Sequence, residues 1–383
     1  MIRKLLYFNF ILLLLCSCKK DTPLTREELT VNDGEVPDSL KINELQYLGS
    51  HNSYRLKPDQ ELFDFLIGLS NVLPAEFNSI ELDYEHLPIN DQLSFYGIRQ
   101  LELDLFLDQH GGLYYNRRGY GLIDRDLASG IPELQEPGIK IMHIPDIDYN
   151  AHQLNFKSTL EEIKSWSEQF PEHLPIFILL ELSEKTVADV LPTAGFAQPE
   201  NWNNSNALNS LEQEILSVFE RNKILIPDDV RGNYPTLNEA VLNDNWPSIG
   251  ESRGKVVFIH NNTNITNTYR AGAPSLENKL IFTNSSPGEP DAAFMLRNSI
   301  NSSLNDINQL ADLGYMIRTR VDAGTYEARD NDYSKWILCL QSGAHFLSTD
   351  YYRPDPRAGE DGWSSYHVGF DNGLYRNNPI TSP

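Results

Sequence analysis

The chain has 383 residues, of which 40% are hydrophobic, and this is enough for a sizeable core within one α/β barrel domain. Its 31 basic and 54 acidic residues give a net charge of −23. This balance excludes a typical nucleic-acid binder, because phosphate backbones are held by clustered Lys and Arg. It also excludes adsorption to anionic lipid that is driven by bulk charge.

The first residues have the pattern of an export signal. Arg3 and Lys4 precede an apolar run that is too short to span a bilayer comfortably. The Leu15-Cys-Ser-Cys18 segment that follows resembles a bacterial lipobox, which implies cleavage before Cys18 and acylation of this residue. An ordinary secretory signal is the alternative. We expect a lipoprotein signal peptide at 1–17, a flexible tether at 18–42, a single domain at 43–383, and an exported protein that is lipid-anchored in the bacterial cell envelope, at the outer membrane.

Strand and helix patterns alternate along the rest of the chain. Apolar residues at helical spacing, as in 156–170, indicate amphipathic helices, and continuous apolar runs, as in 175–182, indicate buried strands. The expected strands are 45–50, 99–106, 140–143, 175–182, 255–260, 280–284, 316–321 and 344–350. The expected helices are 89–96, 156–170, 208–220, 303–313 and 326–342. Eight such units predict an α/β fold, a single (β/α)₈ TIM-type barrel.

Residues 61–73 form an apolar patch on the loop side of the first expected strand. A short helix packed on the body of the domain is the favoured interpretation. The alternative is a hydrophobic rim that contacts a lipid interface.

Polar residues occur at the ends of the first four expected strands. They are His51, Glu102, Asp104, His143 and Glu181. Glu102 and Asp104 are two residues apart on one strand, so their side chains point to the same face. Functional groups of such barrels lie at the C-terminal ends of the strands. A single histidine there is more often structural, but five polar groups on successive strands indicate a site for acid–base chemistry beside a metal.

The carboxylates suggest which metal. Three carboxylates in one place are costly unless a cation compensates them. Oxygen donors from Glu102, Asp104 and Glu181, with the amide of Asn52, form a hard ligand set that suits Ca²⁺ or Mg²⁺. With the histidines reserved for proton transfer, Zn²⁺ is the less favoured ion.

Several short motifs share their residues and spacing with one known family. They are Gly49-Ser-His-Asn-Ser-Tyr54, Tyr84-Glu-His86 with Gln92-Leu93, Gly97-Ile-Arg-Gln-Leu-Glu-Leu-Asp104, His143-Ile-Pro-Asp-Ile-Asp-Tyr149, Leu179-Leu-Glu181, Arg318-Thr-Arg-Val-Asp322 and Phe346-Leu-Ser-Thr-Asp350. Together they resemble the bacterial calcium-dependent phosphatidylinositol-specific phospholipase C family over residues 45–351. None of the motifs is specific alone, but their combined spacing is.

This resemblance implies roles for individual residues. The calcium ligands would be Asn52, Glu102, Asp104 and Glu181. The catalytic pair would be His51 and His143. The chain departs from the large eukaryotic enzymes at 260–262, where His-Asn-Asn replaces the lysines that hold ring phosphates. This difference disfavours polyphosphorylated inositol lipids as substrates.

Two further polar groups have weaker interpretations. Arg318, Arg320 and Asp322 alternate onto one face of the seventh expected strand. An arginine there is suited to hold a phosphate or an inositol hydroxyl, and an internal Arg–Asp ion pair is an equally supported alternative. Asp146 and Asp148 lie in a loop and are interpreted as turn residues.

We expect a monomeric, calcium-dependent phosphodiesterase that cleaves phosphatidylinositol-type lipids to diacylglycerol and inositol 1,2-cyclic phosphate. One alternative is a glycerophosphodiester phosphodiesterase, which is also a barrel with two histidines and acidic metal ligands. A second alternative is a surface lipoprotein that binds inositol lipids or glycans without cleaving them.

Overall fold

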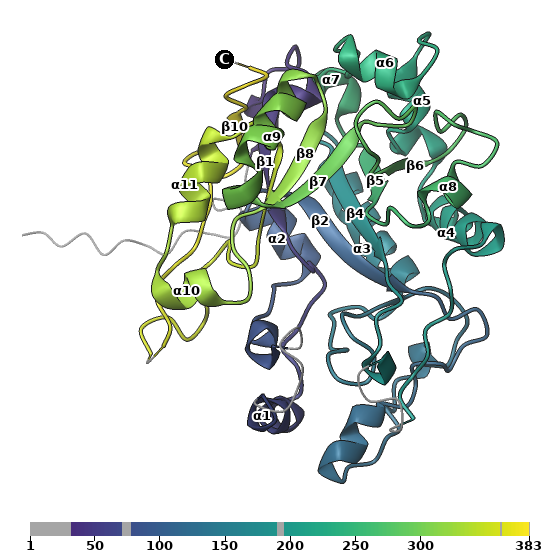
Figure 1. The fold of residues 1–383 in the computed structure, drawn as a ribbon, viewed down its shortest axis with the longest axis vertical. Coiled ribbons are helices and arrows are strands. Elements are labelled where there is room, and N and C mark those ends of the chain that lie inside the picture. Colours follow the sequence, from purple (N-terminus) through teal and green to yellow (C-terminus); the bar gives the residue numbers. More distant parts are fainter. Residues whose placement is uncertain (1–31, 71–77, 190–194, 361, 383) are drawn as a thin grey trace, which may run out of the picture. The chain divides into compact units, whose positions relative to one another are not determined.

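The computed structural model describes residues 32–70, 78–189, 195–360 and 362–382, and eight parallel strands form its centre (Figure 1). The barrel strands are β1 (Leu45–Ser50), β2 (Ile98–Phe106), β4 (Ile176–Leu182), β5 (Val256–His260), β6 (Ile281–Thr283), β7 (Phe294–Ser299), β8 (Met316–Arg320) and β9 (Phe346–Thr349). Their pairing order is β6-β5-β4-β2-β1-β9-β8-β7. A parallel bridge between Asn284 and Phe294 joins the two ends of this order. The predicted closed (β/α)₈ barrel is therefore confirmed.

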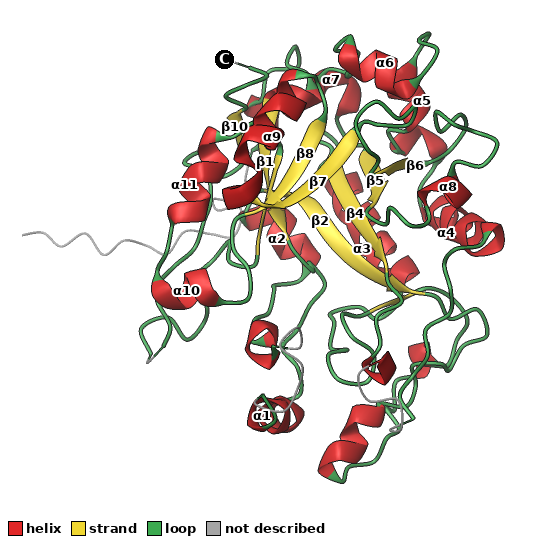
Figure 2. Cartoon of the chain, in the orientation of Figure 1, coloured by secondary structure: helices red, strands yellow, loops and turns green. Residues whose placement is uncertain are grey.

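Helices lie around the strands (Figure 2). The α-helices are α1 (Gln60–Gly68), α2 (Ile89–Phe95), α3 (Phe156–Gln169), α4 (Ser205–Val218), α5 (Pro227–Arg231), α6 (Leu237–Leu242), α7 (Ile249–Ser252), α8 (Thr266–Tyr269), α9 (Ile300–Asp312), α10 (Tyr326–Asp330) and α11 (Ser334–Gln341). The 3₁₀ helices are η1 (Asp33–Glu35), η2 (Ile42–Glu44), η3 (Ser79–Leu82), η4 (Arg118–Ile123), η5 (Pro132–Leu134), η6 (Val187–Asp189) and η7 (Arg221–Lys223). Within the described ranges, no helix is both long and apolar enough to cross a membrane.

Two short strands pair outside the barrel. β3 (Lys140–Ile141) is antiparallel to the end of β2, and β10 (Tyr375–Asn377) is antiparallel to the start of β1. The prediction of a barrel strand at 140–143 is therefore wrong, because β4 occupies the position beside β2 in a continuous parallel register. The remaining barrel strand is β7, which the sequence pattern does not reveal because its second half is partly or fully exposed.

The expected helix at 326–342 is divided into α10 and α11. The division follows Asn331, the residue after α10, which has a left-handed backbone with φ of 56°. An α-helix cannot continue through this conformation, although asparagine tolerates it better than most residues. The short segment between the two helices therefore turns the chain before β9.

Aromatic rings fill the interior toward the N-terminal ends of the strands. These rings belong to Tyr47, Phe177, Phe294 and Phe346, and their neighbouring centroids are 4.6 to 6.3 Å apart. The next position along β1 that points inward is Gly49, where a Cβ atom would lie 2.1 Å from the Gln100 side-chain oxygen. A glycine is needed there because the Gln100 side chain occupies the space. The aromatic rings and Gln100 thus fill the barrel interior toward the N-terminal ends of the strands, and the candidate site residues lie near the C-terminal ends.

The segment before β1 packs on the N-terminal end of the barrel. The buried guanidinium of Arg99 donates from Nε to Asp33 at 2.9 Å, and the same carboxylate accepts the Leu174 amide at 2.9 Å. Val36 and Ile42 are also buried. The folded part therefore begins earlier than the boundary predicted at residue 43. The predicted signal peptide and Cys18 lie outside the described residues.

The apolar patch predicted at 61–73 contains a helix. Leu62 and Leu66 of α1 are buried and pack in a cluster with Phe106 and Tyr114. Phe63 on the same helix is only half-buried. The packed-helix interpretation is confirmed for Gln60–Gly68, and residues 71–73 lie outside the described part of the chain.

Candidate active site

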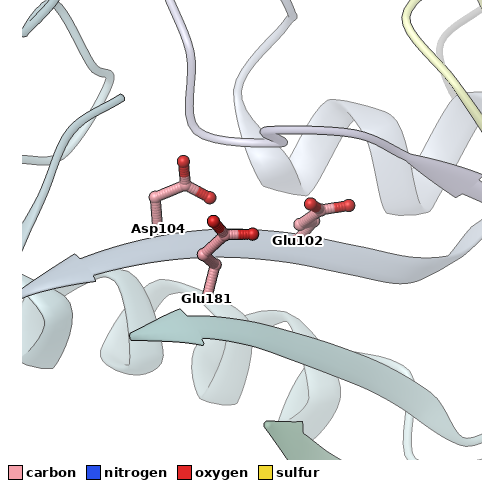
Figure 3. Close-up of side chains that lie close together, drawn as sticks. All are labelled: Glu102, Asp104 and Glu181. Atoms are coloured by element: carbon pink, nitrogen blue, oxygen red, sulfur yellow. The ribbon is translucent and has the colours of Figure 1, made fainter. Parts of the chain in front are cut away.

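Three carboxylates converge at the C-terminal end of the barrel (Figure 3). Glu102 and Asp104 share one face of β2, and the parallel register places Asp104 directly opposite Glu181 of β4. One oxygen atom from each of the three residues lies within 4.8 Å of the others. Like charges directly opposite each other on neighbouring strands are destabilising. The strand register therefore builds a strained acidic cluster, as the sequence pattern predicts.

The cluster is only partly neutralised. Asp104 is buried, and its Oδ1 atom has no hydrogen-bond partner among the described residues. Burial, with the charges of Glu181 and Glu102, raises the pKa of Asp104 well above its usual range. The opposing cations are Lys185, whose Nζ atom lies 3.0 Å from Glu181, and Arg318, which donates to Glu102. A buried, unpartnered carboxylate oxygen beside two other carboxylates fits a hard divalent cation such as Ca²⁺.

Asn52 lies beside this cluster. It follows β1 with a left-handed backbone (φ 49°) and is buried. Its Nδ2 atom donates to the Tyr84 hydroxyl at 3.2 Å, so the amide oxygen is the atom available as a ligand. The neighbouring Ser53 amide donates to the Glu102 carbonyl at 2.9 Å and fixes this turn against β2. The structure thus brings all four predicted metal ligands to one end of the barrel.

His51 is held by an aspartate and an arginine. An arginine can only donate, so Arg320 donates from Nη1 to His51 Nε2 at 3.2 Å. The His51 proton is then on Nδ1, which lies 2.9 Å from Asp350 Oδ1. Burial and the charge of Arg320 lower the pKa of His51 well below its usual range. His51 is therefore a neutral, oriented imidazole, with Nε2 also 3.9 Å from Glu102 Oε1.

His143 has a similar partner but a different origin from the one predicted. It lies in the loop after β3 and not at the end of a barrel strand. Its Nδ1 atom is 2.7 Å from Asp148 Oδ2, which also accepts from Arg55 Nη2 at 2.7 Å. Burial lowers the pKa of His143, although the Asp148 hydrogen bond and charge oppose this effect.

Only half of the turn interpretation for Asp146 and Asp148 holds. Asp146 accepts hydrogen bonds from the Arg118 and Ala197 amides and stabilises the loop. Asp148 instead orients a candidate catalytic histidine, a role that its sequence position does not signal.

Both histidines face one cavity. Its volume is about 340 Å³. The lining residues are His51, Asn78, Glu81, Leu82, Tyr84, His143, Ile144, Lys185, Arg320, Gly324 and Asp350. The carboxylate cluster lies beside it, because Lys185 contacts Glu181 and His51 approaches Glu102. One ligand in this cavity can therefore meet two imidazoles next to a cation site.

The three residues predicted for substrate binding have different surroundings. Arg318 is buried and forms an ion pair with Glu102. Arg320 lines the cavity but forms an ion pair with Asp350. Asp322 accepts the Asp350 amide at 2.7 Å, and burial with the Asp350 charge raises its pKa to about 7. Both arginines form internal ion pairs, although neither pairs with Asp322 as the sequence pattern suggested.

Asn261 is a further site residue that the sequence pattern does not mark. Its Nδ2 atom donates to Glu181 Oε2 at 3.0 Å from the end of β5. The preceding His260 is buried, and neither of its ring nitrogens has a hydrogen-bond partner among the described residues.

The comparisons with known proteins agree with this geometry. A family model described as phosphoinositide phospholipase C, Ca²⁺-dependent, matches residues 40–379. The chain belongs to this family. No curated protein matches the chain. This phospholipase C is also similar in fold to two solved structures of a calcium-dependent phosphoinositol-specific phospholipase C from a Gram-negative bacterium, Pseudomonas sp. One, a myoinositol complex, is 15% identical with a TM-score of 0.51 over 89% of this chain and 96% of the other. The second, in crystal form 1, is 14% identical with a TM-score of 0.51 over 89% and 97%.

Membership in the family identifies the chain as a calcium-dependent phospholipase C that acts on phosphatidylinositol-type lipids. The alternatives of a glycerophosphodiester phosphodiesterase and of a non-catalytic lipoprotein are therefore set aside. The resemblance read from the seven motifs is confirmed.

Proposed function

We propose that the enzyme cleaves phosphatidylinositol by internal transfer to the inositol 2-hydroxyl and releases diacylglycerol and inositol 1,2-cyclic phosphate. The observation that carries this proposal is the pair of aspartate-oriented histidines, His51 and His143, that face one cavity beside the acidic cluster. A phosphodiester beside a free hydroxyl brings its own nucleophile, which has a large proximity advantage over water.

The two imidazoles divide the proton transfers. The 2-hydroxyl oxygen forms a bond to phosphorus and gives its proton to Nε2 of the neutral His51 ring, which lies 3.9 Å from Glu102 Oε1. The bond from phosphorus to the glycerol oxygen breaks, and His143 donates a proton to this leaving oxygen. Asp148 stabilises the protonated ring of His143, and imidazoles transfer protons well near neutral pH. Protons and bonds balance without a water molecule in this step.

Calcium would be held by Asn52, Glu102, Asp104 and Glu181, where it would act as a Lewis acid toward a phosphoryl oxygen and the attacking hydroxyl. Its binding is supported by the family and by the unpartnered Oδ1 atom of Asp104.

We also propose that the inositol ring carries no further phosphates. The cations near the cavity are paired with carboxylates: Arg320 pairs with Asp350, and Lys185 pairs with Glu181 as long as no metal ion binds there. At the end of β5, Asn261 bonds Glu181. No row of free cations for ring phosphates is present among the described residues that line the cavity.

Phosphorus NMR of the products tests the proposed reaction. Phosphatidylinositol should give the cyclic phosphate first, the reaction should stop in excess chelator, and a 2-deoxy-inositol lipid should be inert. The His143→Ala variant should recover rate on a substrate with a nitrophenol leaving group, which needs no acid, whereas His51→Ala should not. Equal loss of both variants on both leaving groups would contradict the division of roles.

We propose finally that the mature enzyme is exported and anchored by acylated Cys18. The support is the short apolar run and the Leu15-Cys-Ser-Cys18 segment. Mass spectrometry of the mature N-terminus tests it, because cleavage elsewhere or an unmodified cysteine contradicts the anchor.

A further inference from the structure

Lys185 is a cation in the cavity with an unusual environment. It follows β4 in the chain, and its Nζ atom lies 3.0 Å from Glu181 Oε1. It lines the cavity together with His51 and His143. Its side chain is nevertheless 52% exposed, so solvent surrounds half of it. It is therefore close to the acidic cluster and also free to move.

The two arginines nearby are fixed in comparison. Arg318 is buried and donates to Glu102, Asn298 and Ser348. Arg320 has a side chain that is 17% exposed and donates to both Asp350 and His51. Among the described residues, Lys185 forms its ion pair with Glu181 alone.

Glu181 cannot serve Lys185 and a metal ion equally well. Its Oε1 atom faces Lys185, and its Oε2 atom accepts from Asn261 at 3.0 Å. An ammonium group only donates hydrogen bonds, so it cannot coordinate a metal ion, and its positive charge repels the ion. A divalent cation among Glu102, Asp104 and Glu181 therefore competes directly with Lys185.

We propose that Lys185 is an exchangeable counter-ion, which neutralises Glu181 in the metal-free enzyme and binds the substrate phosphate once calcium has taken Glu181. The phosphate part rests on the proposed function. A phosphodiester between His51 and His143 would lie in the cavity that Lys185 lines, and it supplies the negative charge that Lys185 loses. A lysine suits this exchange because its ammonium is a point charge on a flexible stem.

The exchange has two consequences of opposite sign. Without a phosphate ligand, Lys185 weakens calcium binding, because the ion must displace it. With a phosphate ligand, Lys185 couples the two sites, so the ligand tightens calcium binding and calcium tightens ligand binding by the same factor. A lysine that only stabilises the loop would produce neither effect.

Titration calorimetry of Ca²⁺ into the purified enzyme, with and without inositol 1,2-cyclic phosphate, measures both effects. The Lys185→Met variant should bind Ca²⁺ about fivefold more tightly than the wild type, the upper end for a half-exposed ion pair. The cyclic phosphate should also raise its calcium affinity by a smaller factor than in the wild type, because the part of the coupling that Lys185 supplies is lost. Lys185→Arg keeps the charge and should retain both behaviours.

A matched control is available on α3. Lys164 forms a comparable i,i+4 pair with Glu168, at 3.7 Å and with a side chain that is 37% exposed. Lys164→Met should leave the calcium affinity unchanged. Unchanged or weaker calcium binding by folded Lys185→Met would overturn the proposal, as would coupling to the cyclic phosphate that is as large as in the wild type. Hydrolysis of phosphatidylinositol by the wild type is measured separately. If the wild type does not produce the cyclic phosphate but Lys185→Met still binds calcium more tightly, the proposed reaction is refuted and the counter-ion role is kept.

Discussion

Replacement of Asp104 by asparagine should have opposite effects on stability and on activity. Asp104 is buried, and its nearest acidic oxygens lie within 4.8 Å. Two unit charges at this separation repel by roughly 3 kcal/mol at an effective dielectric constant of 20. Lys185 and Arg318 offset part of this repulsion. In the metal-free protein, Asp104→Asn should therefore raise the free energy of unfolding by about 1–2 kcal/mol.

The sign of the pH dependence follows from the raised pKa of Asp104. A carboxyl group whose pKa is higher in the folded state favours folding when it is protonated. This contribution is lost as the pH rises from the pKa of the unfolded state, about 4, through the higher pKa of the folded state. The increase in the free energy of unfolding that Asp104→Asn produces should therefore be larger at pH 8 than at pH 4.5. Urea unfolding in chelator at the two pH values measures this difference.

Added calcium should make the wild type more stable than Asp104→Asn, the reverse of their order in the metal-free protein. The wild type should gain about 2.7 kcal/mol when free calcium is a hundred times the dissociation constant, and Asp104→Asn should gain far less and lose hydrolysis. The control is Asp148→Asn, which leaves the fully buried Arg55 without its ion pair and should cost about 3–5 kcal/mol. If Asp104→Asn destabilises the metal-free protein as much as Asp148→Asn does, the acidic cluster is structural and the reasoning fails.

Three other changes test separate parts of the molecule. Burial lowers the pKa of His260 to about 4, so the imidazole takes up a proton in the unfolded state first, and unfolding is favoured as the pH falls below the ordinary histidine pKa of about 6.5. In urea unfolding, His260→Phe should therefore stabilise the protein relative to the wild type by roughly 2 kcal/mol more at pH 5 than at pH 8. Cys18→Ala should release the enzyme from the membrane fraction on cell fractionation, and retention there would contradict the anchor. If α1 contacts lipid, Phe63→Ser should slow hydrolysis of vesicles and spare a water-soluble phosphodiester, and equal slowing of both would indicate a packing role.

The sequence was informative where a local period determines the geometry. The two-residue spacing of Glu102 and Asp104 puts both carboxylates on one face of β2, and the apolar run before Glu181 marks β4 as its buried neighbour. The barrel class follows from the same alternation of strands and helices. These features depend only on residues that are close in the chain.

The partners of the histidines could not be found in this way. Asp350 is 299 positions from His51, and no local pattern connects them. Asp148 is five positions from His143, but an aspartate in a loop is commonly a turn residue, and only the folded loop shows which role it has. The misplaced strand at 140–143 has a similar cause, because a strand of only two residues, as β3 is, pairs equally well inside or outside a barrel.

The charges of the site favour the substrate phosphate only when calcium is present. With all three carboxylates ionised, Glu102, Asp104 and Glu181 contribute −3, and Lys185 with Arg318 contributes +2, which leaves −1. The raised pKa of Asp104 favours a proton on this carboxylate in the metal-free enzyme, and this proton brings the sum to zero. The aspartates beside the two histidines are each neutralised by an arginine and do not change this sum. A divalent cation that displaces the proton changes the sum to +1, and a phosphodiester with a single negative charge brings the total to zero. The metal-free cavity therefore has no net charge to attract the substrate phosphate, whereas the calcium-loaded cavity does, so calcium should bind before the lipid headgroup.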